Sequence, residues 1–298
     1  MKTSINDYLK MILDILIIFI TLTKSKIKDF SIPIKISFNN KKNKKCFLLG
    51  NGPSLNTDID KIINLTDPST DIYAVNYFGR SQFFKKLKPN YYFFSDKMFW
   101  SKDLIEKVKK DNEDIFNILR NVNWKITIIC PKEGYDFIKN QIFENKNLSF
   151  YVVPIRYSNL LTEKLTYLSI KNRFFSIPNV NSVITLLWMS IFSRYKKITL
   201  YGCDFSAFKT LMVDQKTNEI IVSTKHFYGN SSAEKNAGKK YLGQKDKPLS
   251  VRLFQVHRAF RQLDILAKVS RELSVEVING SSFSFIDSFP RANQVSKK

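Results

Sequence analysis

The sequence predicts an α/β fold: a Rossmann-like, mostly parallel sheet with helices on both faces and a lid insertion. Two observations indicate it. From Lys45 onward, short apolar runs alternate with longer amphipathic stretches, which is the order of strands and crossover helices in a parallel sheet. The first apolar run leads into a glycine-rich turn at 50–54, where such a fold brings its backbone close to a ligand.

Seven short runs have the composition of strands that are covered on both faces, because several of them are almost wholly apolar. They are Cys46–Leu49, Ile72–Val75, Tyr91–Phe94, Ile126–Cys130, Phe150–Val153, Ile198–Tyr201 and Val275–Ile278.

Three stretches between these runs predict helices. Ser101–Lys110 is polar and amphipathic, and Ser182–Phe192 is so apolar that we expect a buried helix. The third, Leu249–Leu273, carries an apolar stripe at helical spacing. The stripe consists of Leu253, Val256, Phe260, Leu263 and Leu266.

The chain divides into an N-terminal segment (1–44), a main domain (45–291) and a short tail (292–298) that we expect to be solvated. Within the main domain, residues from about 206 to 248 are rich in Lys, Gly, Asn and Ser. A long polar insertion in a compact α/β fold is typical of an active-site lid or a disordered loop.

The N-terminal segment holds an apolar stretch, Met11–Leu22, that is broken by Asp14. It is shorter than the ~20 apolar residues of a spanning helix, and no small-residue cleavage site follows it. Lysines come after it, at Lys24, Lys26, Lys28, Lys41, Lys42, Lys44 and Lys45. An apolar helix followed by lysines fits a segment that lies on an anionic membrane. A helix packed on the domain is the alternative.

The chain carries 48 Lys and Arg against 26 Asp and Glu, a net charge of +22. Such a charge predicts an anionic partner, namely nucleic acid, an acidic membrane surface or a phosphorylated substrate. The cysteines are Cys46, Cys130 and Cys203, all in or beside apolar runs, and they read as buried, reduced thiols of a cytoplasmic protein. With two histidines in the chain, a His-rich metal site is excluded.

The glycine turn is the first candidate site. It consists of Gly50, Asn51, Gly52, Pro53 and Ser54. Two glycines permit a sharp turn and close approach to a ligand, and the residues that follow can open a helix whose first amides bind phosphate. Leu55 stands where the dinucleotide fingerprint needs a third glycine, so this is not the usual NAD pattern.

Polar residues end other apolar runs in the same way. They are Asn76, Ser95 with Asp96, and Gly202 with Asp204. Asn181 and Ser182 stand where the cap of the buried helix belongs. Because ligands of an open parallel sheet bind at the carboxyl ends of its strands, we expect all of these residues on one rim.

Five stretches taken in order carry a family resemblance: "FLLGNGPSL", "VNYF", "NS" before the apolar helix, "KKITLYGCDF" and "KHFYGNS". They resemble the bacterial sialyltransferases of glycosyltransferase family 42, which use CMP-sialic acid to cap lipooligosaccharides. The similarity runs from about Lys45 to Arg291. It implies a modified Rossmann-like domain with a lid over the donor, an inverting mechanism, and no metal ion or other cofactor.

The resemblance also implies roles for single residues. Asn51 matches an Asn beside the donor's phosphate and cytidine, and Asn76 matches another Asn that faces the donor. Ser182 matches a Ser that contacts the donor's carboxylate or phosphate. Ser95 stands where the family has an Asn, and Ser206 where it has a Tyr that binds the leaving phosphate.

The lid departs from the family as well. Asn230 stands where the family has the His proposed as the base. We therefore expect His226, in the same lid, to act as the base, because imidazole titrates near the operating pH. Asp204 is the alternative base, or it holds its own turn. Tyr228 can supply a phosphate hydrogen bond, and the basic lid candidates are Lys225, Lys235, Lys239, Lys240 and Arg252. His257 reads as a packed or surface residue.

The expected partners are a CMP-sugar donor, an anionic glycolipid or glycan acceptor, and the inner face of the inner membrane, to which the protein binds peripherally. CMP-Kdo is an alternative donor, and a homo-oligomer is left open. One alternative function is a pterin-type diphosphokinase, which needs Mg²⁺ and convergent carboxylates. Only Asp96 and Asp204 offer such a pair.

The other alternative is a non-catalytic basic protein bound to a membrane or to nucleic acid. The 25 Phe and 13 Tyr residues could stack on bases. They fall mainly inside apolar runs, and the sequence holds no nucleic-acid motif, so nucleic acid is not an expected partner.

Overall fold

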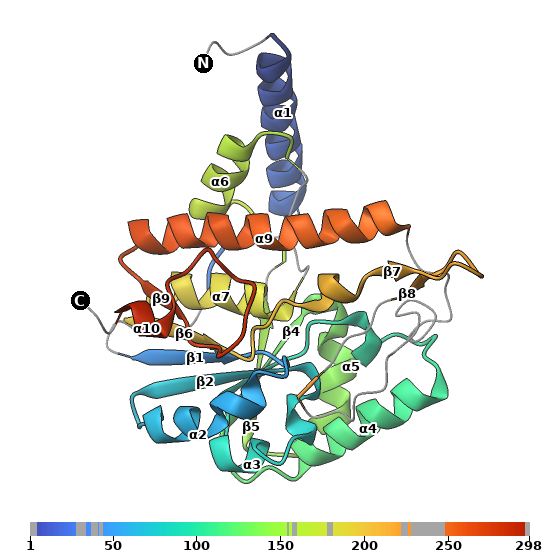
Figure 1. Ribbon diagram of the computed structural model, residues 1–298, viewed down its shortest axis with the longest axis vertical. Coiled ribbons are helices and arrows are strands. Elements are labelled where there is room, and N and C mark those ends of the chain that lie inside the picture. The colour runs from blue at the N-terminus through green and yellow to red at the C-terminus, as the bar shows by residue number, and fades with distance from the viewer. Residues whose placement is uncertain are drawn as a thin grey trace.

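The computed structural model describes residues 5–27, 34–36, 41, 44–153, 155–156, 160–177, 181–221, 226–227 and 248–295. Its centre is a seven-stranded parallel sheet with the strand order β5-β4-β3-β2-β1-β6-β9 (Figure 1). The strands are β1 Lys45–Leu49, β2 Thr70–Val75, β3 Tyr91–Phe93, β4 Ile126–Pro131, β5 Leu148–Val153, β6 Lys197–Tyr201 and β9 Glu276–Asn279. All seven predicted strands are present within about two residues, and the predicted α/β fold class is confirmed.

The helices are α1 Ile5–Ile27, α2 Leu55–Leu65, α3 Phe84–Leu87, α4 Glu106–Arg120, α5 Lys132–Ile142, α6 Glu163–Lys171, α7 Ser182–Phe192, α9 Leu249–Glu272 and α10 Ala292–Val295. Short 3₁₀ turns lie at η1 Asn76–Arg80, η2 Lys97–Phe99 and η3 Ala207–Thr210. Within the predicted lid, β7 Met212–Val213 and β8 Ile220–Ile221 form a small antiparallel pair.

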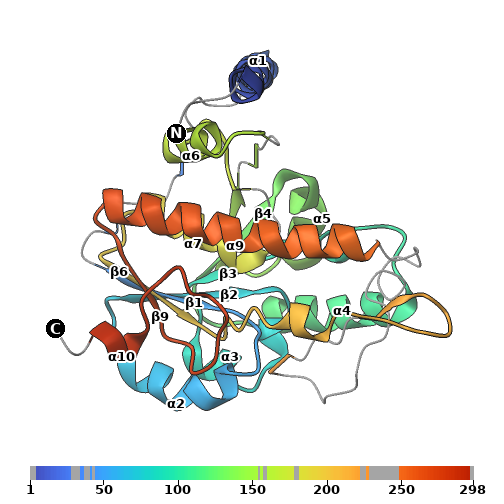
Figure 2. The same ribbon diagram turned by 45° about the horizontal axis from the view of Figure 1, so that its top comes forward.

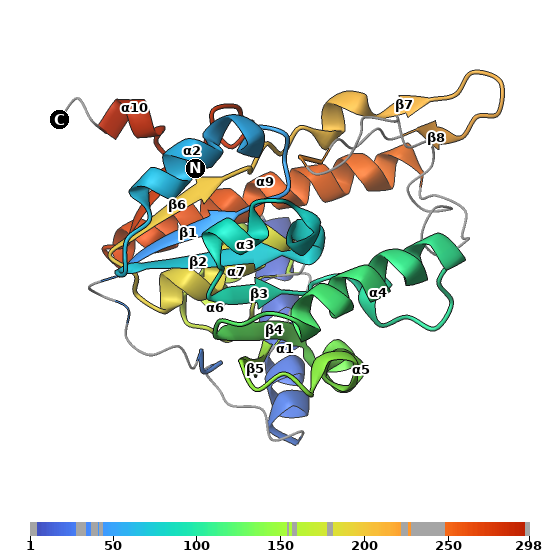
Figure 3. The same cartoon turned by 90° about the horizontal axis from the view of Figure 1, so that it is seen from below.

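The sheet is covered on both faces, which explains why its strands are so apolar. In β1, Cys46 and Leu48 belong to one core cluster and Phe47 and Leu49 to the other. The first cluster is built largely on α7 and α9, and the second on α2, α4 and α5. Figure 3 shows the strands in order, with α2 and α3 on the near side and α9 on the far side.

Two helix predictions need correction. The helix predicted at Ser101–Lys110 begins at Glu106 and continues to Arg120. Ile105 before it is still extended. The helix continues because Val108, Asn112, Ile115, Phe116 and Leu119 recur at helical spacing and are buried. In α9, Leu263 and Leu266 are buried as predicted, but Leu253 is 51 % exposed.

Both terminal segments contain a helix. Four residues of the predicted solvated tail form the short helix α10. The apolar stretch Met11–Leu22 lies inside α1, and Asp14 does not break that helix but is buried. None of the helices in the described part of the chain is long and apolar enough to cross a membrane.

The order of the strands defines where a ligand can bind. β1 pairs with β2 on one side and with β6 on the other, both in parallel. The connections therefore leave β1 and β6 in opposite directions along the sheet, and a crevice opens beyond the carboxyl ends of these two strands.

Candidate functional site

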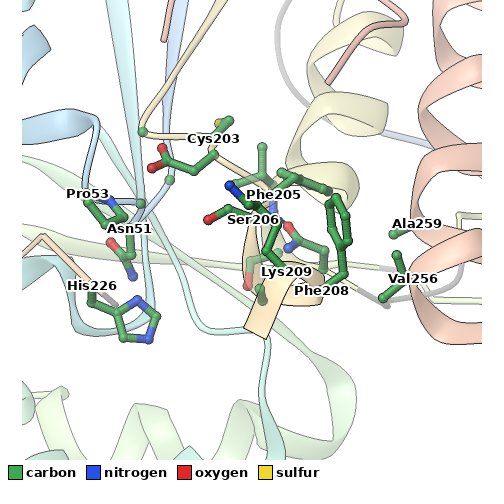
Figure 4. Close-up of a pocket in the computed structure, with 18 of the residues that line it drawn as sticks. Asn51, Pro53, Cys203, Phe205, Ser206, Phe208, Lys209, His226, Val256 and Ala259 are labelled. Carbon is green, nitrogen blue, oxygen red and sulfur yellow. Dashed lines mark hydrogen bonds between the residues drawn. The ribbon is translucent and has the colours of Figure 1, made fainter. Parts of the chain in front are cut away.

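A cavity of about 840 Å³ lies at this crevice (Figure 4). Its polar end is lined by the glycine turn after β1, by Asn76 and Asp96, and by the amino end of α7. Its other end is lined by residues 202–211 after β6 and by the first half of α9. Figure 4 shows Asn51, Pro53 and His226 across the cavity from Phe208, Val256 and Ala259.

The turns after β1 and β6 are packed directly against each other. The amide of Gly52 donates to the carbonyl of Gly202 over 2.8 Å, and the amide of Gly50 donates to that of Tyr201, also over 2.8 Å. A Cβ on Gly52 would lie 2.3 Å from the Asp204 carboxylate, and one on Gly50 would lie 2.3 Å from the Gly202 carbonyl. The glycines are thus needed for the two turns to meet.

Asp204 holds this contact together. Its two carboxylate oxygens accept hydrogen bonds from the Ser54 amide (3.1 Å) and the Ser54 hydroxyl (2.5 Å). Burial raises the pKa of Asp204, and the bonds from Ser54 offset this only in part. Holding the turn is therefore the role that the geometry supports for Asp204. Ser54 is buried behind the cavity wall and does not line the cavity.

A second network ties the ends of β2 and β3 to α7. The Asn76 side-chain amide donates to Asp96 (2.8 Å) and to the Ser182 hydroxyl (3.1 Å), and its oxygen accepts from the Ser95 amide (3.2 Å). The hydroxyls of Ser95 and Ser182 are 2.5 Å apart. Asn76 and Ser182, far apart in the sequence, thus meet at one wall of the cavity. Ser95 supports them from behind and is not part of the lining.

The amino end of α7 points at the cavity. Asn181 caps the helix by accepting a hydrogen bond from the Val183 amide over 2.9 Å, and all three of Asn181, Ser182 and Val183 line the cavity. The first amides of an eleven-residue helix carry a partial positive charge that favours an anionic ligand.

Asn51 lies in the turn itself, among the cavity-lining residues. Its side-chain amide donates to the Val75 carbonyl over 3.2 Å. Its side-chain oxygen is buried without a hydrogen-bond partner among the described residues. A buried acceptor left unsatisfied costs about 1–3 kcal/mol, so a ligand that donates a hydrogen bond to it would be favoured.

His226 is held beside this turn. The amide of its neighbour Phe227 donates to the Asn51 carbonyl over 3.1 Å, and Asn56 donates to the Phe227 carbonyl, also over 3.1 Å. The Phe227 ring is buried against Phe78. His226 itself is exposed and lines the cavity. The other lid candidates, Tyr228, Asn230, Lys225, Lys235, Lys239 and Lys240, lie outside the described residues.

The opposite end of the cavity is aromatic and basic. Phe208 packs edge-on against Phe260 (6.0 Å between ring centroids) and against Phe285 (5.0 Å). The Lys209 ammonium lies 5.3 Å from the Phe285 ring centre. Ser206, predicted for the donor site, lines this end together with Arg252.

Several lining residues were not predicted: Phe208, Lys209, Gln255, Val256, Ala259 and Phe283. A signal for part of this set was present in the sequence. Gln255 lines the cavity beside Val256 and Ala259 of α9, which puts a polar side chain where a purely structural helix would have an apolar one. His257 is exposed and does not line the cavity.

The chain matches no family model and no curated protein sequence. Among solved structures, it is similar to an α-2,3-sialyltransferase from Campylobacter jejuni, crystallised in its apo form. The two are 16 % identical in sequence, the match covers 76 % of this chain and 98 % of that one, and the TM-score is 0.34. This similarity is distant. Within the described residues, no group of three or more His, Cys, Asp or Glu side chains could hold a metal ion.

Proposed function

We propose that the protein is an inverting, metal-independent glycosyltransferase. It transfers sialic acid or a related sugar from a CMP-sugar to a cell-surface glycan such as lipooligosaccharide or capsule. One observation carries the proposal. Asn51, Asn76, Ser182 and the 202–204 turn carry the motifs that resemble the sialyltransferases, and all of them line one cavity at the switch point of the sheet.

The cavity suits the size and charge of a sugar nucleotide. Its volume of about 840 Å³ falls within the roughly 300–1,000 Å³ of small-molecule sites. The donor's phosphate meets the amino end of α7, which favours a negative charge. Lys209 and Arg252 line the same cavity. They lie at its opposite end, from which their positive charges favour the anionic donor in place of the tyrosine that Ser206 replaces.

Transfer follows a single displacement. The acceptor hydroxyl oxygen forms a bond to the anomeric carbon as the bond from that carbon to the phosphate oxygen breaks, and the electron pair of the broken bond leaves with CMP. His226 takes the hydroxyl proton, since its side chain opens into the cavity beside the glycine turn. Asp204 is committed to Ser54 and positions the turn.

The acceptor that fits the charge is anionic. A protein of net charge +22 attracts glycans that carry phosphate or carboxylate groups. The three cysteines are buried and form no disulfide, which agrees with a cytoplasmic location.

The test is a thermal-shift panel with CMP, UDP and GDP, each in excess EDTA. We expect selective stabilisation by CMP, because ligand binding to the folded state raises Tm. In Ser182→Ala, at least tenfold more CMP should be needed to produce the same rise in Tm. Ser288→Ala is the matched control, since its hydroxyl bonds to Asp264 (2.8 Å) outside the cavity.

Equal stabilisation by all three nucleotides, or by none, would contradict the proposal. Release of CMP from CMP-N-acetylneuraminic acid in EDTA tests the reaction itself. Turnover that appears only when Mg²⁺ is added would favour the diphosphokinase alternative.

A further inference from the structure

The outer face of α1 is the most exposed apolar surface among the described residues. Nine of its large apolar side chains are between 48 % and 81 % exposed. They are Ile5, Tyr8, Leu9, Ile12, Leu13, Ile15, Leu16, Phe19 and Ile20. Because they recur at intervals of three and four, they form one continuous stripe, roughly 22 Å long at ~1.5 Å per residue.

The inner face of the same helix is already occupied. Asp14 is buried, and its carboxylate accepts hydrogen bonds from the Leu161 and Thr162 amides over 2.7 and 2.8 Å. It also accepts from the Thr162 hydroxyl over 2.6 Å. Thr162 is the residue directly before α6. Asp14 therefore ties α1 to the residues directly before α6 and fixes which side of α1 faces the protein.

Helix α1 stands clear of the body. Figures 1 and 2 show it beyond α9 with only α6 beside it, so the outer stripe faces away from the sheet. The length of the stripe, from Ile5 to Ile20, contains three charged residues, and none of them lies on it. They are Asp7, Lys10 and Asp14, which share the inner side at helical spacing, and Lys24 lies beyond Ile20 at the edge of the stripe. The Thr23 hydroxyl, which falls in line with the stripe, bonds back to the Phe19 carbonyl over 2.8 Å.

We infer that α1 lies in the headgroup region of an anionic membrane, with its outer stripe among the acyl chains. The stripe is broad and carries no charge, whereas a helix pair between two copies needs only a narrow seam, usually with ion pairs along its edges. A net charge of +22 repels a second copy and attracts anionic lipids. The helix is not long and apolar enough to span a bilayer, which fits a helix that lies on one.

The experiment measures binding of the full chain to vesicles, with no nucleotide present. The probes are vesicles of phosphatidylcholine alone and of phosphatidylcholine with 30 mol % phosphatidylglycerol. We expect binding to the anionic vesicles that is at least tenfold tighter than to the neutral ones. Leu16→Glu with Phe19→Glu should weaken it a further tenfold or more, since burying one such side chain contributes about tenfold on its own.

The matched control is Leu65→Glu with Phe143→Glu. These side chains are 47 % and 62 % exposed, against 52 % and 69 % for Leu16 and Phe19. They carry the same change of charge but lie outside α1. The control pair should lose no more than about threefold, because its added charges lie in the body away from α1 and the attraction to the membrane falls off within a Debye length.

A second measurement holds even if the glutamate variants fold poorly. The tryptophan introduced by Phe19→Trp should be quenched by brominated lipids, because it lies among the acyl chains. The tryptophan introduced by Phe143→Trp should not be quenched. The inference is overturned if Leu16→Glu with Phe19→Glu binds as the wild type does, or if Phe19→Trp is not quenched. It is also overturned if the wild type dimerises in lipid-free buffer and that pair abolishes the dimer, because the stripe then binds a second copy. None of these readouts depends on the proposed reaction.

Discussion

The two ends of the central strands carry similar polar residues and use them differently. At the amino ends of β1, β2 and β6, Asp71 is buried and accepts from Lys44 (2.8 Å), Lys41 (2.9 Å) and Tyr195 (2.6 Å). Tyr195 in turn lies 3.0 Å from the Tyr73 hydroxyl. At the carboxyl ends, polar side chains bond to one another but also face a cavity.

The difference separates stability from function. A closed network in which each buried charge has its partners contributes to the fold and offers nothing to a ligand. A network that opens on a cavity leaves side chains such as Asn76 and Ser182 within reach of one. Polar residues at strand ends therefore indicate a ligand-binding site only when they also line a cavity.

Replacing His226 is the change with the largest expected effect, and it tests the cavity end. His226→Ala should lower turnover by roughly 10²–10⁴ and leave CMP affinity within about twofold. The measurement is steady-state transfer together with CMP binding. His257→Ala is the control, since that exposed histidine does not line the cavity. Near-normal turnover in His226→Ala would show that His226 is not the general base.

Asp71→Ala tests the opposite end. It leaves Lys41 and Tyr195 without their buried partner, and such a loss costs about 3–5 kcal/mol. We expect a fall in Tm of roughly 6–20 °C, measured by calorimetry. CMP binding at a temperature where the variant is folded should be unchanged. Altered CMP affinity with little change in Tm would break the comparison between the two ends.

Gly52→Ala should have the opposite effect to Asp71→Ala, because it should weaken CMP binding more than it lowers Tm. The added Cβ would fall 2.3 Å from Asp204 and force the two turns apart, so CMP binding should weaken tenfold or more. The matched control is Gly79→Ala, whose Cβ would meet the Tyr92 hydroxyl at 3.1 Å and which does not line the cavity. Equal loss of CMP affinity in both variants would show that the effect is not local to the turn.

The smallest expected effect is on the pH dependence of stability. Burial raises the pKa of Asp71, but hydrogen bonds from Lys44, Tyr195 and Lys41 outweigh it and leave the pKa below its usual range. A lowered carboxyl pKa stabilises the folded state above the unfolded pKa of about 3.9, and this contribution is lost as the pH falls below it. The stability gap between wild type and Asp71→Asn should therefore shrink from pH 6 to pH 3, measured by urea unfolding.

The sequence allowed the central sheet to be predicted because burial on both faces leaves a direct mark on composition. Strands β1 and β6 could be predicted from their own apolar composition, without knowing which strands they pair with. Helix α7 could be bounded at both ends, since its composition is apolar throughout and Asn181 caps it. Helix α4 was misplaced because its buried positions begin only at Val108, and a polar segment before them resembles a first turn.

The rest depended on contacts between distant parts of the chain. Asp14 looked like an interruption of an apolar stretch, because its partners Leu161 and Thr162 lie far along the sequence. In the same way, nothing in the sequence near Asp204 shows that Ser54 occupies both of its oxygens. Lys209 was missed because a lysine in a polar insertion carries no signal of what it faces.

The parallel register at the centre of the sheet has a consequence for how the chain folds. Lys45 pairs with Lys197 and Leu49 with Tyr201, so one edge of β1 stays uncovered during synthesis until β6 leaves the ribosome. Strands β1 to β5 can assemble earlier, but the crevice between β1 and β6 forms only after β6 has been made. We expect chains truncated before residue 197 to aggregate through that open edge, and chaperones to be needed most at this stage.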